Sequence, residues 1–112
     1  MAENIRVSDI PLNERPVEKL LQFGVESLSN EELLAILLRT GTKGENVIAL
    51  SKRLLIELDG LDGLLNVSFE EASKIKGIKK VKACQIIAMI EMFNRFRTLK
   101  SQRESFKISS PK

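Results

Sequence analysis

Four lysines lie within seven residues of the segment KGIKKVK, at Lys76, Lys79, Lys80 and Lys82. The segment follows a short amphipathic stretch and precedes a long apolar one, so we expect a tight turn between two helices. A helix start leaves backbone N–H groups without partners and carries partial positive charge, which favours a bound anion. The pattern therefore predicts a helical hairpin whose turn binds phosphate groups.

The residues of this turn are typical of a helix-hairpin-helix, whose turn usually reads Gly-hydrophobic-Gly. Gly77 and Ile78 match the first two positions, whereas Lys79 occupies the third and supplies side-chain charge in place of a close backbone approach. Contacts of this kind recognise phosphates and not base edges, so we expect salt-dependent DNA binding without sequence preference. The expected contacts are Lys76, Gly77, Ile78, Lys79, Lys80 and Lys82. The competing interpretation is a solvated basic turn that keeps the protein soluble.

The segment TGTKG is a second candidate turn, in which Gly41, Lys43 and Gly44 are candidate phosphate contacts. An offset of 36 residues aligns Gly41 with Gly77, which suggests two similar hairpins packed as a pair. Two alternatives remain open. Helical hairpins resemble one another by construction, and Glu45 adds negative charge at the same helix start, as in a plain interhelix turn.

Helices are the elements that must position these turns, because Leu, Ile and Ala dominate the apolar residues. Capping boxes at Ser29 and Ser68, together with apolar periodicity, predict helices over 16–23, 30–39, about 45–60, 69–75 and 80–99. The segment from Val81 to Ile90 is apolar almost all round, so we expect it to be buried, with Cys84 as inert packing. We predict an all-α domain of five helices over 16–100, related to tandem helix-hairpin-helix or SAM-like folds. Residues 1–15 are read as an arm and 101–112 as a linker.

Composition excludes several classes of function. The chain has no histidine and a single cysteine, which removes His-based catalysis, nearly all zinc sites and any internal disulfide. We therefore expect no catalytic residues, no metal and no cofactor in this chain. No apolar run approaches the roughly 20 residues of a membrane span, so we expect no membrane association and a cytoplasmic location.

Charge is divided unevenly along the chain. Residues 1–73 hold seven Lys/Arg and thirteen Asp/Glu, whereas residues 74–112 hold eleven and two. A basic half of this kind is an electrostatic footprint for a polyanion. Neutralisation of one half of the chain by the other is the alternative.

The run ERPVEKLLQFGVESLSNEELLAILLRTGTKG, followed by KIKGIKKVKACQI, resembles the N-terminal region of the RadC (UPF0758) family of bacterial proteins. The resemblance implies an association with DNA repair and, in the full-length protein, a C-terminal domain similar to JAB/MPN metalloproteases, which bind zinc through a His-x-His and Asp motif. This chain stops where that domain would begin, so no metal or peptidase residue is carried over. The alternative function is a protein-interaction module that docks a partner or the C-terminal domain.

Overall fold

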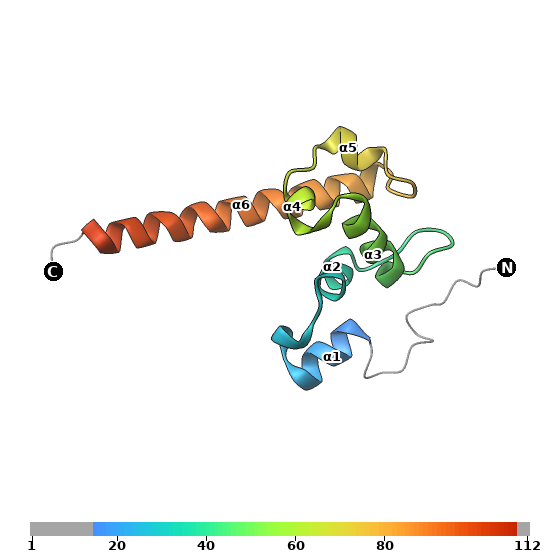
Figure 1. Cartoon of the computed structure of the whole chain (residues 1–112), viewed down its shortest axis with the longest axis horizontal. Helices are drawn as coiled ribbons and strands as arrows, with labels where there is room; N and C mark the ends of the chain where they lie inside the picture. The colour runs from blue at the N-terminus through green and yellow to red at the C-terminus, as the bar shows by residue number, and fades with distance from the viewer. Residues whose placement is uncertain (1–14, 110–112) are drawn as a thin grey trace.

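The computed structural model describes residues 15–109, which form helices joined by short turns (Figure 1). The helices are α1 (Pro16–Phe23), α2 (Asn30–Leu38), α3 (Val47–Glu57), α4 (Gly60–Leu65), α5 (Phe69–Ser73) and α6 (Lys80–Ser109), and a 3₁₀ helix (Val25–Ser27) joins α1 to α2. The all-α class is confirmed. The described residues form six α-helices and not five, because α4 lies between the expected third helix and the capping box at Ser68.

Three helices begin with a side chain that caps the first turn. The Ser29 hydroxyl accepts a hydrogen bond from the Glu32 amide of α2, and the Glu32 carboxylate accepts one from the Ser29 amide. Ser68 and Glu71 make the same pair of hydrogen bonds at α5, so both predicted capping boxes are confirmed. Asn46 caps α3 through its side-chain oxygen, and that helix therefore begins slightly later than expected.

Residues with positive φ lie at the end of α1 and between α3 and α4. Gly24 has a φ of 92° and ends α1 where the sequence predicted it. Gly60 was expected as the stop of the third helix, which ends slightly earlier, at Glu57. Asp59 and Gly60, with φ of 64° and 92°, instead reverse the chain into α4. Because left-handed backbone is readily adopted by glycine, Gly60 suits the reversal better than a helix interior.

The hydrophobic core lies between α2, α3 and the first half of α6, and α4 and α5 complete it. Its buried side chains are Leu34, Ala35, Leu38, Val47, Leu50, Leu54, Leu64, Val67, Ala72, Ile75, Ile78, Ala83 and Ile86. The prediction that α6 is buried all round from Val81 to Ile90 is wrong. Val81 is 80% exposed and Cys84 is also exposed, because α6 packs against the core with one face only.

The second half of α6 extends away from the other helices (Figure 1). The helix is 30 residues long, which corresponds to about 45 Å. Every residue from Arg95 to Glu104 is exposed. Residues 101–109 continue the helix where the polar composition suggested an irregular linker, and their linking role stays a prediction. The predicted arm lies outside the described residues apart from Arg15.

Candidate nucleic-acid interface

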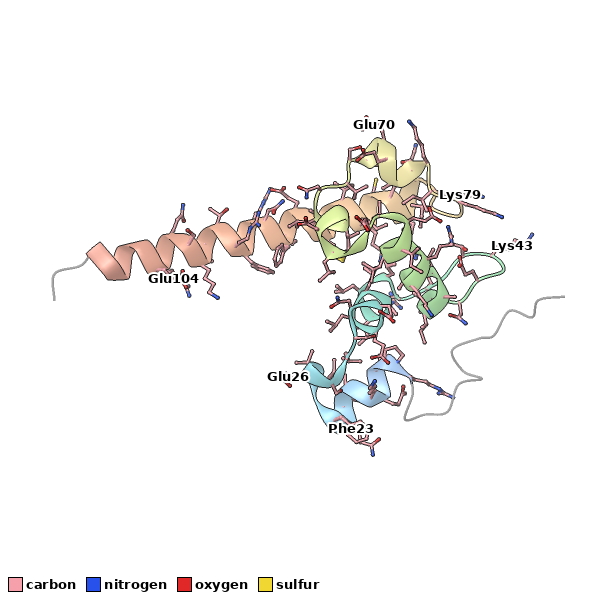
Figure 2. The ribbon with its side chains drawn as sticks, viewed as in Figure 1. Phe23, Glu26, Lys43, Glu70, Lys79 and Glu104 are labelled. Carbon is pink, nitrogen blue, oxygen red and sulfur yellow. The ribbon has the colours of Figure 1, made fainter. Side chains whose placement is uncertain are left out.

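The two glycine-lysine turns, far apart in the sequence, lie against each other in the fold. A Cβ built on Gly77 would lie 3.3 Å from the Thr42 hydroxyl oxygen, so the turn before α6 touches the turn before α3. Lys43 and Lys79, one from each turn, point away from the helices at the same end of the molecule (Figure 2). The two candidate phosphate sites are therefore neighbours on one surface.

The first turn is tightly closed by its own backbone. Thr42 and Glu45 exchange two backbone hydrogen bonds, each with an N···O distance of 3.0 Å. A Cβ on Gly41 would lie 2.0 Å from the Glu45 carbonyl oxygen, a distance that no side chain can adopt. The sequence predicted Gly41 as a phosphate contact, and the structure shows that its lack of a side chain is needed for packing within the turn.

Arg53 of α3 joins the two turns. Its guanidinium donates to both carboxylate oxygens of Glu45, at 3.1 and 2.9 Å. It also donates to Glu57 at 3.0 Å and to the Lys76 carbonyl oxygen at 2.6 Å. The hydrogen bonds to Glu45 raise the pKa of Arg53 most, against the opposing effect of partial burial, so this cation stays charged.

Sequence reasoning missed the structural role of Arg53. The spacing of Arg53 and Glu57 along one helix indicates an ion pair, as observed. No sequence pattern, however, indicates the hydrogen bond to Lys76, which lies 23 residues further along the chain.

The start of α6 differs from those of α2, α3 and α5, because it has no capping side chain. Lys79 precedes the helix and offers no acceptor, and the first turn contains no acidic residue. Within the described chain, the backbone amides of Lys80, Val81 and Lys82 have no hydrogen-bond acceptor, since the first bond at this end joins the Ala83 amide to the Lys79 carbonyl. Three donors at the positive end of a long helix are thus open to an anion.

Gly77 and Ile78 fix the turn before α6 in place. Gly77 has a φ of 87°, a conformation that glycine adopts without strain. Ile78 was expected among the DNA contacts, but its side chain is 2% exposed and lies in the core, so it fixes the turn in place and does not face a ligand. Lys76, Lys79 and Lys80 are exposed, and their side chains have no hydrogen-bond or ion-pair partner in the part of the chain that the structure describes.

Lys82 has a different environment from the other lysines of the turn. Its ammonium donates to the Thr40 carbonyl at 2.8 Å, to the Thr40 hydroxyl at 2.9 Å and to the Leu38 carbonyl at 3.3 Å. Partial burial lowers its pKa. Lys82 was expected to contact phosphate, but here it satisfies carbonyl groups at the end of α2, so we do not carry that role forward.

Residues 15–109 contain no group of three or more His, Cys, Asp or Glu side chains arranged to hold a metal ion. No helix in this range is both long and apolar enough to cross a membrane. Glu91 of α6 is exposed and forms an ion pair with Arg95.

Known proteins resemble this chain over its full length. The family model described as UPF0758 N-terminal matches residues 7–84. A UPF0758 protein of Clostridium beijerinckii is 59% identical over 112 residues, which are all of this chain and 49% of that protein. UPF0758 proteins of Clostridium botulinum and Clostridium acetobutylicum are each 58% identical, over 99% and 97% of this chain and 48% and 47% of their own lengths.

The chain therefore spans about half the length of the curated relatives it matches. No solved structure shows a significant match.

Proposed function

Because this chain belongs to the UPF0758 family, through its N-terminal domain, we propose that it binds the phosphate backbone of DNA without sequence preference. Membership confirms the family that the sequence resemblance indicated. In a longer protein this domain would hold the remaining half of the chain on DNA, in support of DNA repair. The binding surface consists of the two adjacent turns, with Lys76, Lys79 and Lys80 as the principal cations.

The uncapped start of α6 is the observation that carries this proposal. A lysine at a helix start opposes the macrodipole and lowers helix stability. Lys79 and Lys80 nevertheless occupy this position, beside backbone amides that have no acceptor in the described chain. A phosphate group would accept hydrogen bonds from these amides and neutralise the charge of the lysines. The lysines, which are unfavourable at a helix start in the free protein, would then stabilise the complex.

The first turn extends the surface to a second phosphate. Lys43 is exposed and lies at the same end of the molecule as Lys79 (Figure 2). Glu45 would repel DNA at this position, but its carboxylate is fully engaged by Arg53. The second turn therefore provides the stronger contact and the first turn the weaker one.

A salt titration of duplex DNA binding tests the proposal. We expect the variant Lys76→Gln/Lys79→Gln/Lys80→Gln to bind at least about tenfold more weakly at low salt, with a log–log salt slope smaller by about 2 to 3. The matched control replaces Lys52, Lys100 and Arg103 by Gln, which removes the same charge away from the turns. Equal losses in both variants would attribute binding to net charge and refute a site at the turn.

The proposed role in DNA binding includes no catalysis and a location in the cytoplasm. We assign no catalytic step to this chain, which has no histidine, and we expect it in the cytoplasm of its bacterial host, where DNA is accessible. Turnover of DNA or of a peptide by the isolated chain would contradict this assignment.

A protein-interaction module is the second candidate function. The observation that favours it is an apolar groove between α2, α4 and α6, on residues other than those of the turns. The two functions are compatible, since they use different surfaces.

A further inference from the structure

An apolar groove of about 440 Å³ opens between α2, α4 and α6. Its main lining residues are Leu33 and Leu37 of α2, Leu61 of α4, and Met89, Ile90 and Phe93 of α6. Leu37, Leu61 and Phe93 are each about half exposed, at 55%, 52% and 49%. Contiguous exposed apolar surface of this kind marks an interaction site.

The apolar surface continues along α6 beyond the groove. Met92, Phe93, Phe96 and Leu99 are between 49% and 60% exposed. Phe96 follows Met92 by four residues and Phe93 by three, and Leu99 follows three residues later, so they form one stripe on the helix. No other described element covers this part of α6, where residues 95–104 are all exposed. An isolated helix of about 15 residues is marginal in water, which indicates that a partner covers the stripe.

The charges around the groove and the stripe are opposite. Asp62 lies in the lining of the groove, and residues 15–73, which supply α2 and α4, hold six Lys/Arg and ten Asp/Glu. Residues 92–103 of α6 hold Arg95, Arg97, Lys100 and Arg103 and no acidic residue. One molecule thus carries an apolar groove in an acidic region and an apolar stripe in a basic region.

We propose that a second copy of this chain covers the groove, with the two α6 helices antiparallel and crossing near Phe96. A surface that complements itself in this way pairs through a twofold axis. Counting residues from the crossing, Leu99 of each copy would meet Phe93 of the other at the mouth of the groove. The basic second half of each α6 would then approach the acidic region around Asp62.

Sedimentation of the purified 112-residue chain over a range of concentrations tests this pairing. We expect a monomer–dimer equilibrium that Phe96→Glu and Leu37→Glu each weaken at least tenfold. The control is Ile56→Glu, at a residue of α3 that is 70% exposed and does not line the groove. Circular dichroism of each variant verifies that its fold is intact.

A charge exchange tests the orientation. Asp62→Arg should weaken the dimer, and adding Arg103→Asp in the same chain should restore it. A chain that stays monomeric at every concentration would refute the proposal and leave the groove to another occupant, such as the remaining half of a longer protein. A dimer that Phe96→Glu leaves intact would refute it equally, because the copies would then meet on another face.

Discussion

The two turns share a sequence pattern but differ in how their polar groups are satisfied. In the first turn, Asn46 caps α3, and the Glu45 carboxylate is neutralised by Arg53. In the second, α6 starts with Lys79 and Lys80, and its first amides have no acceptor in the described chain. One turn is therefore completed within the fold, whereas the other leaves donors and positive charge available to a ligand.

The largest effect should come from filling the first turn. Gly41→Ala would place a Cβ 2.0 Å from the Glu45 carbonyl oxygen, so backbone must move. We expect the free energy of unfolding to fall by about 3 kcal/mol, measured by chemical denaturation. The control is Gly60→Ala, where φ is positive but nothing lies within 4 Å of the added atom. It should cost only about 1 kcal/mol. Equal losses would show that the first turn is less tightly closed than described.

Removal of the link between the turns should have the next largest effect. Arg53→Gln breaks the hydrogen bonds to Glu45 and to the Lys76 carbonyl, and leaves a carboxylate without its partner. We expect a loss of about 2 kcal/mol in unfolding free energy together with weaker DNA binding. Arg95→Gln, which breaks an exposed ion pair on α6, should change stability by no more than about 0.5 kcal/mol. A comparably small effect for Arg53 would mean that the turns are held together by other contacts.

A smaller effect concerns the pH dependence of the capping box at Ser29. Burial raises the pKa of Glu32, but hydrogen bonds from the Ser29 amide and from Lys19 lower it by more, so the net pKa is below its ordinary value. A depressed pKa gives stability that is present above the unfolded-state value and lost as pH falls through the folded-state value. Unfolding free energy should therefore fall more below about pH 5 in the native chain than in Glu32→Gln. Parallel pH curves for the two chains would exclude this contribution.

The smallest effect concerns the buried face of the first hairpin. Ser51 of α3 is fully buried, and its hydroxyl has no hydrogen-bond partner among the residues that the structure describes. The equivalent position of the second hairpin, 36 residues later, is Ile87. Ser51→Ala removes an unsatisfied polar group, so unfolding free energy should stay constant or rise by up to about 1 kcal/mol. A loss of stability would reveal an unrecognised partner for the hydroxyl.

Local sequence signals predicted the frame of this fold well. The capping boxes at Ser29 and Ser68, the positive φ of Gly77 and the burial of Ile78 each depend on a few neighbouring residues, so they could be recognised without the structure. The continuation of α6 to Ser109 was missed because a polar composition suggested a linker, although no Gly or Pro lies between Lys80 and Pro111.

Features that depend on packing between distant segments could not be predicted. The exposure of Val81 and Cys84 depends on which face of α6 meets the core. Because apolar residues lie on all sides of that segment, its sequence does not indicate which face is buried. Arg53 and Lys82 reach carbonyl groups 23 and 42 residues away. Composition and spacing show that these side chains are charged, but not where they bind.

The central claim, that the open start of α6 binds phosphate, is tested most directly by giving α6 the kind of cap that α3 has. In Lys79→Asn the new side chain would accept a hydrogen bond from a backbone amide at the start of α6, so unfolding free energy should rise by about 1 kcal/mol. Affinity for duplex DNA at low salt should fall severalfold, with a smaller salt slope. A capped, more stable variant that binds DNA with unchanged affinity and salt dependence would contradict the claim.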